Sequence, residues 1–341
     1  MEPKPIRSAG SIPAPCVIDV SCSASVVTIR TPAQPMTPIR LLWRSILLAA
    51  TLAAATAVEA APKGDIRIDD TGVYPESLSA SPDGAIYIGS IKGVVFRAPP
   101  DASVAKPWIR PTAQNGILSI LGVLADAPHR TLWICSSPSP FRTPPAVGTT
   151  ALMAFDLKSG GQKGVYPFPA PNGACNDITI ARDGGAYATD TPNGRIVVLK
   201  PHAKALELFA ADDRLKGIDG IVFGGDGTLY LNIVSKGQLM RVDRGPDGKM
   251  TGLTELKLSQ PVAGPDGFRL ISGNRFLLAE GNSGRIDDVT IKGDSARIKV
   301  LKEGLVSPPG VTLSGHTAYG LEGKITYLFD PKLKGQSPRS T

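Results

Sequence analysis

The sequence predicts an all-β fold, a six-bladed β-propeller with a central channel, and three observations support this expectation. The 341 residues include 37 glycines and 31 prolines, a turn density that suits many short strands better than a helical bundle. Hydrophobic residues make up 42% and charged residues 20%, which is enough apolar surface for a sizeable core. One template of anchor, small residue, turn and apolar strand recurs six times at a period of about 45 residues, as is typical of propeller blades.

Residues 1–60 are expected to be a leader that the mature protein lacks. Residues 1–35 are polar and rich in Pro and Ser, which suggests that the start of the protein is assigned too far upstream and that Met36 is the true start. After Met36, two arginines, an uncharged run over 45–58 and a small-residue end at Ala60 form the three parts of a signal peptide. The run is short against the roughly 20 residues of a membrane span, so a permanent anchor is the less favoured alternative. We expect a periplasmic or secreted protein.

The propeller is expected over 61–330, followed by a flexible tail at 331–341. Cys16 and Cys22 would leave with the leader, whereas Cys135 and Cys175 would remain. In an exported protein these two cysteines form one disulfide or stay as buried thiols, and the sequence leaves both alternatives open.

Each repeat has an anchor residue at the same template position, with spacings of 45, 55, 43, 47 and 43 residues. The six anchors are Glu76, Leu121, Asn176, Asp219, Asp266 and Pro309. The residue seven positions after each anchor belongs to a hairpin turn, and these turns are Asp83-Gly84, Pro128-His129, Asp183-Gly184, Asp226-Gly227, Gly273-Asn274 and Gly315-His316. A β-sandwich with coincidental turns is the alternative, and six matches at one offset disfavour it.

Equivalent positions in a propeller face one axis, so the anchors are expected to converge there. Glu76, Asn176, Asp219 and Asp266 then supply oxygen atoms, and a bound divalent cation would relieve the repulsion among the three carboxylates. Oxygen donors favour Ca²⁺, with Mg²⁺ or Mn²⁺ as alternatives and Zn²⁺ less suited. The competing interpretation is that the Asp-Gly pairs at 219 and 266 are ordinary turn residues.

On these positions the chain resembles the SMP-30/gluconolactonase/LRE-like superfamily of six-bladed propellers, and more distantly the paraoxonases and strictosidine-synthase-like proteins. The matching residues are Glu76 in Pro-Glu, Asn176 in Asn-Asp-Ile, Asp219 in Asp-Gly-Ile and Asp266 in Pro-Asp-Gly-Phe. The resemblance implies one divalent metal held by these four residues, with Asp266 as general base. Two positions depart from it, because Ala174 replaces an Arg that holds sugar lactones and Leu121 replaces a His of paraoxonase-like lactonases.

The resemblance therefore implies an exported metal-dependent hydrolase of a lactone or ester, with a metal-polarised carbonyl and a carboxylate base. The alternative is a non-catalytic propeller with a structural metal that binds a small ligand or a protein. The strand after each hairpin turn returns to the anchor face, which makes four polar residues candidate substrate contacts, with ordinary loop roles as the alternative: Asp190, Asn232, Glu280 and Asn282.

Composition excludes other classes of function. The net charge is +7, but the basic residues form no cluster typical of a nucleic-acid-binding surface. The three histidines and four cysteines show no zinc-site spacing, and His129, His202 and His316 are expected in surface loops. A small-molecule substrate is the expected partner, without nucleic acid or a permanent membrane span, and the sequence identifies no protein partner.

Overall fold

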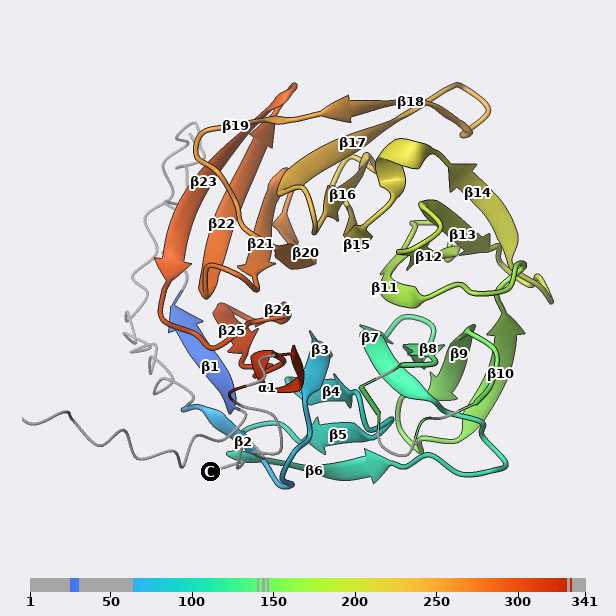
Figure 1. Cartoon of the computed structure of the whole chain (residues 1–341), viewed down its shortest axis with the longest axis vertical. Helices are drawn as coiled ribbons and strands as arrows, with labels where there is room; N and C mark the ends of the chain where they lie inside the picture. Colours follow the sequence, from blue (N-terminus) through green and yellow to red (C-terminus); the bar gives the residue numbers. More distant parts are fainter. Residues whose placement is uncertain are drawn as a thin grey trace, which may run out of the picture.

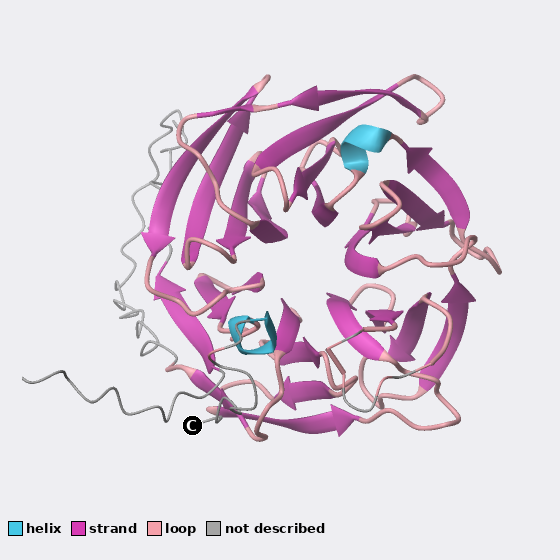
Figure 2. Cartoon of the chain, in the orientation of Figure 1, coloured by secondary structure: helices cyan, strands magenta, loops and turns pink. Residues whose placement is uncertain are grey.

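The computed structural model describes residues 25–30, 64–139, 141–142, 145, 147–329 and 332. Within them, six blades surround one axis (Figure 1), and this arrangement confirms the predicted six-bladed propeller. Strands dominate the described chain, whose helical segments are the 3₁₀ turn η1 (Asp213–Leu215) and the short helix α1 (Thr326–Phe329) (Figure 2). Neither of these segments has the length or apolar character needed to cross a membrane.

Each blade is an antiparallel meander that runs from the axis to the rim, so that consecutive strands pair. From the inside outward, blades 1 to 3 are β3 (Pro75–Ala80), β4 (Ile86–Ser90), β5 (Val95–Ala98) and β6 (Val104–Ile109); β7 (Ser119–Asp126), β8 (Thr131–Ser137), β9 (Ala151–Asp156) and β10 (Gln162–Pro167); and β11 (Cys175–Ile180), β12 (Ala186–Asp190), β13 (Arg195–Leu199) and β14 (Glu207–Ala211).

Blades 4 and 5 repeat this pattern, and the outer edge of blade 5 carries one additional short strand, β19 (Lys257–Leu258), paired in parallel. Their strands are β15 (Ile218–Phe223), β16 (Leu229–Ile233), β17 (Gln238–Arg244) and β18 (Met250–Glu255); and β20 (Pro265–Ser272), β21 (Arg275–Glu280), β22 (Arg285–Lys292) and β23 (Ser295–Lys302).

The predicted hairpin turns all join the first and second strands of their blades. Gly84 has φ of 92°, a conformation that a residue with a Cβ avoids, and the Asp83 carboxylate accepts a hydrogen bond from the Ala85 N–H at 3.1 Å. Asp183 and Asp226 make the corresponding bond in blades 3 and 4. Local turn chemistry therefore fixes where each innermost strand ends.

Packing between the blades is apolar and aromatic. Tyr187 of blade 3 meets Phe223 of blade 4 edge-to-face with ring centroids 5.2 Å apart, and Tyr230 of blade 4 meets Phe276 of blade 5 at 5.4 Å. Tyr187 and Tyr230 therefore serve in packing between blades.

The sixth blade contains a strand that the sequence did not reveal. Its inner strands are β24 (Gly310–Ser314) and β25 (Thr317–Leu321), followed by β1 (Ser25–Arg30) and β2 (Ile66–Ile68). β1 pairs with β25 over five residues, and its Val26 and Ile29 are 0% and 4% exposed. The ring thus closes by joining the N-terminal part of the chain to the C-terminal part.

β1 lies inside the segment expected to be a leader, so cleavage after Ala60 would remove it from the blade. The expected signal peptide at 36–60 falls outside the described residues, and so does the expected tail at 331–341 apart from residue 332. The positions of the start and of the cleavage site stay predictions.

A chain that begins at residue 61 is expected to unfold at a lower temperature than the full chain. Removal of β1 unpairs β25 and exposes core that Val26 and Ile29 cover, a loss of several kcal/mol that corresponds to roughly 5–15 °C. Differential scanning calorimetry of both chains measures the difference. Equal melting temperatures would mean that the blade does not need β1. Cleavage of residues 1–60 as a leader would then be compatible with the fold.

Candidate functional site

Five of the six anchors sit where the pairing of an innermost strand is irregular. The register shifts fall between residues 75 and 77, 120 and 122, 175 and 178, 218 and 221, and 265 and 268. A β-bulge leaves a residue out of the ladder and re-aims its side chain. This local irregularity frees the anchor side chains from their own blades.

Asp219 and Asp266 lie within β15 and β20, so the interpretation of these Asp-Gly pairs as ordinary turn residues is wrong. The following glycines serve a different purpose. A Cβ on Gly220 would lie 2.3 Å from the Asp266 carbonyl oxygen, and one on Gly267 would lie 2.9 Å from the Gly310 Cα. Glycine after the anchor therefore lets neighbouring innermost strands approach closely.

The four polar anchors come together from four blades. The Asn176 Nδ2 donates to Asp219 Oδ2 at 2.9 Å, and the carboxyls of Asp219 and Asp266 interact electrostatically. Glu76 interacts electrostatically with both Asp219 and Asp266. Asp219 is buried, whereas Glu76, Asn176 and Asp266 keep partial exposure.

Burial and the charges of neighbouring carboxylates raise the pKa values of all three anchor carboxyls. Burial, followed by the charge of Asp219, raises the pKa of Glu76 to about 8. Burial, followed by the charge of Asp177, raises the pKa of Asp219 to about 7. Burial and then the neighbouring Asp219 and Glu76 raise the pKa of Asp266 well above its ordinary value. Near neutral pH this cluster holds protons that ordinary carboxyls would have released.

The donor set fits a divalent cation. Three carboxyls and one amide oxygen are hard donors of the kind that Ca²⁺ takes, and Glu76 Oε2 is buried without a hydrogen-bond partner. In the part of the chain that the structure describes, no three His, Cys, Asp or Glu side chains already stand together in metal-coordinating geometry. The raised pKa values of these carboxyls mean that a cation would have to displace the protons that they hold.

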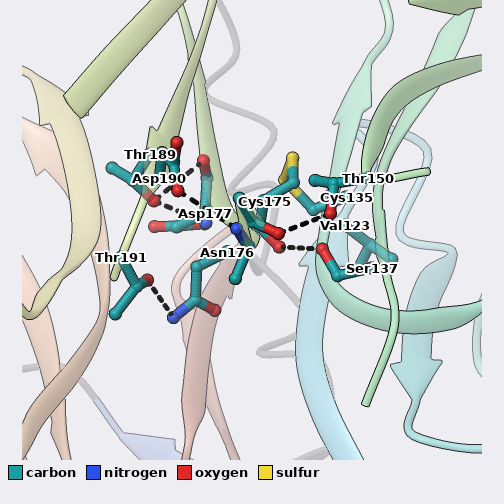
Figure 3. The surroundings of a disulfide bond; sticks show 12 residues. Val123, Cys135, Ser137, Thr150, Cys175, Asn176, Asp177, Thr189, Asp190 and Thr191 are labelled. Carbon is teal, nitrogen blue, oxygen red and sulfur yellow. Dashed lines mark hydrogen bonds between the residues drawn. A yellow bond between two sulfur atoms is a disulfide. The ribbon is translucent and has the colours of Figure 1, made fainter. Parts of the chain in front are cut away.

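A disulfide lies beside the Asn176 anchor (Figure 3). Cys135 on β8 and Cys175 on β11 are joined across blades 2 and 3, both fully buried, with Cα atoms 5.0 Å apart. The neighbouring Asn176 also donates to Thr191 Oγ1 at 3.1 Å. The structure therefore selects the disulfide over two free thiols and ties the strand of this anchor to the adjacent blade.

Two of the candidate substrate contacts, Asp190 and Glu280, are fully buried in equivalent ion pairs. Asp190 accepts from Arg195 and from the Ala174 N–H at 3.1 Å. Glu280 accepts from Arg285 and, at 2.6 Å, from the Ala263 N–H. Each carboxylate thus fastens the loops of its own blade, which favours the structural alternative.

The other two candidates differ from each other. Asn232 is fully buried, accepts from the Gly220 N–H at 3.0 Å and donates to the Asp266 carbonyl oxygen at 2.6 Å, so it joins the backbones of two anchor segments. Asn282 is exposed beside Gly264. Asn282 alone among the four presents an exposed side chain to a ligand.

The three histidines lie away from the anchors, as expected. The His129 Nδ1 lies 2.9 Å from the carboxylate of Asp126 at the far end of blade 2, and His202 and His316 occupy turns.

An ion pair between Asp177 and Arg269 is a feature that the sequence did not suggest. Arg269 on β20 forms a bidentate bond to Asp177 on β11, with both nitrogen–oxygen distances at 2.7 Å. The side chains are 6% exposed for Asp177 and 11% for Arg269. The available signal was a charged residue three positions after the Asp266 anchor, where blades 1, 3 and 6 carry Ser or Thr.

No protein-family model and no curated protein matches this chain. Solved structures match at low identity. A gluconolactonase from Xanthomonas campestris is 18% identical over 75% of this chain and 91% of its own, with a TM-score of 0.55. A catalytically inactive His-to-Ala variant of virginiamycin B lyase from Staphylococcus aureus, solved with quinupristin, is 16% identical over 73% of this chain and 80% of its own, with a TM-score of 0.53.

A chain of a nidogen/laminin complex is 19% identical over 70% of this chain and 85% of its own, with a TM-score of 0.54. At these identities the comparisons establish the propeller fold, which enzymes and binding proteins share.

Proposed function

We propose that this propeller is an exported, metal-dependent hydrolase of a lactone or ester. The observation that carries the proposal is the convergence of Glu76, Asn176, Asp219 and Asp266 from four blades. The buried Cys135–Cys175 disulfide supports export, because such bonds persist in oxidising compartments. The similarity to a gluconolactonase supports the substrate class.

A divalent cation held by these four residues, with Ca²⁺ as the best fit, would polarise the substrate carbonyl. Asp266 is partly exposed, and once a cation has displaced its proton the carboxylate would take a proton from water. Water adds to the carbonyl carbon, its proton passes to Asp266, and the proton then reaches the alkoxide oxygen as the acyl–oxygen bond breaks. The hydrogen bonds of Asn176 to Thr191 and Asp219 hold its amide in a fixed orientation.

Lyase chemistry fits the residues less well. The matching virginiamycin B lyase is inactive when a histidine is replaced, and none of the three histidines here occupies an anchor position.

The alternative function is ligand or protein binding around a structural metal. Ala174 and Leu121 favour this alternative, because neither side chain offers a polar group to a substrate.

Hydrolysis of aliphatic, sugar and aryl lactones, measured by proton release with Ca²⁺ or Mn²⁺ and after chelation, tests the proposal. We expect turnover that chelation abolishes and added cation restores. Turnover that survives complete chelation would refute the metal mechanism. Cation binding without turnover of any substrate would favour the binding protein.

A further inference from the structure

The channel contains a buried positive charge close to the anchor carboxyls. Three residues after the anchor, Ser79, Thr179 and Thr312 use a side-chain oxygen to accept a backbone N–H of the next blade. Arg269 occupies this position in blade 5 and instead reaches past blade 4 to Asp177 in blade 3. The guanidinium interacts electrostatically with Asp266 and Asp219 as well.

Asp177 and Arg269 differ in whether all their polar atoms have hydrogen-bond partners. Asp177 is saturated, since both oxygens bind Arg269 and Oδ2 also accepts the Ile221 N–H at 3.1 Å. Arg269 donates to Asp177 and to the Phe268 carbonyl oxygen, while its Nε is buried without a partner. The fixed positive charge of Arg269 thus lies beside the anchor carboxyls, which are expected to bind a divalent cation.

We propose that Arg269 is a charge-balancing residue that lowers the affinity of the anchor cluster for a divalent cation, and that Asp177 offsets this repulsion and holds the guanidinium in place. This role rests on the proposed metal site. Arg269 remains protonated at all working pH values, so its charge acts whether or not a cation is bound. In the cation-free protein the same charge attracts the carboxylates that Asp219 and Asp266 become on ionisation.

The test compares two double variants that differ in one charge. Both variants carry Asp177→Asn, which keeps an oxygen that can accept the Ile221 N–H. One adds Arg269→Met, which removes the positive charge, and the other adds Arg269→Lys, which keeps it. Replacing both partners of a buried ion pair by neutral groups is often tolerated. Calorimetric titration with Ca²⁺ and Mn²⁺ at pH 8 is expected to show at least about tenfold tighter binding by the Met variant than by the Lys variant.

The matched control is the pair Arg275–Asp288 in blade 5, which is bidentate and similarly buried but lies at the other end of its strands. Asp288→Asn with Arg275→Met or Arg275→Lys should leave cation affinity unchanged. Melting temperatures without cation report folding separately. If one of the two double variants at positions 177 and 269 fails to fold, the other can still be compared with the wild type. The Met variant should match or exceed the cation affinity of the wild type, and the Lys variant should fall below it.

Equal cation affinity in the Met and Lys variants of position 269 would overturn the charge-balancing role and leave the metal site intact. A shift of the same size in the control pair would show that the effect is general rather than local. Absence of cation binding in the wild-type protein and all variants would refute the metal site, and with it the role of Arg269.

Discussion

Replacement of Asp266 by Asn is expected to weaken cation binding by about a hundredfold or more and to abolish hydrolysis. The substitution preserves the shape of the side chain on β20 but removes one of three carboxylates and the proposed proton acceptor. An amide oxygen is a weaker donor to a hard cation than a carboxylate. Calorimetric titration with Ca²⁺ and Mn²⁺, together with the lactone assay, measures both effects.

Asp83→Asn is the matched control, because Asp83 is also an aspartate between apolar strand residues. It lies exposed in the hairpin turn of blade 1, and Asn can accept the same hydrogen bond from the Ala85 N–H. We expect unchanged cation affinity and a change in stability below about 0.5 kcal/mol.

The two variants should also differ in stability only when cation is present. A ligand that binds the folded state stabilises it, so Asp266→Asn should lose the rise in melting temperature that cation gives the wild type. Equal cation affinities for the Asp266 and Asp83 variants would contradict the assignment of the anchors to one site.

The parts of the fold that depend on local sequence were predictable. Turn chemistry such as Asp83-Gly84 is set by neighbouring residues, and it recurs at a fixed distance from each anchor. Identical template positions in a propeller face a common axis, and this rule predicts that Glu76, Asn176 and the two aspartates lie together.

The features that escaped prediction depend on contacts between distant segments. β1 completes a blade whose other inner strands lie almost 300 residues later, and no local pattern identifies that partner. Arg269 meets Asp177 across 92 residues. Asp190 and Glu280 have the composition of substrate contacts, and only their burial against Arg195 and Arg285 shows that they hold loops together.

The cation-free protein is expected to lose stability as the pH rises from about 4 to 8. Glu76 and Asp219, with pKa values raised to about 8 and about 7, keep their protons in the folded state, whereas in the unfolded chain they ionise near pH 4. Between these values the unfolded state binds fewer protons, so the free energy of unfolding falls as pH increases. Thermal unfolding across this range should show a decrease on the order of 10 °C.

Saturating Ca²⁺ should reverse only part of that decrease, because one raised carboxyl lies outside the anchor cluster. Burial, followed by the neighbouring Glu280 carboxyl, raises the pKa of Asp287 to about 8, and its side chain is fully buried in blade 5. Asp287→Asn cannot ionise, so it should be more stable than the wild type at pH 8 and not at pH 4. Cation should stabilise this variant and the wild type equally at pH 8, since the anchors are untouched. If melting temperature without cation does not fall between pH 4 and pH 8, these carboxyls are not held protonated in the folded protein, and a cation has no bound protons to displace.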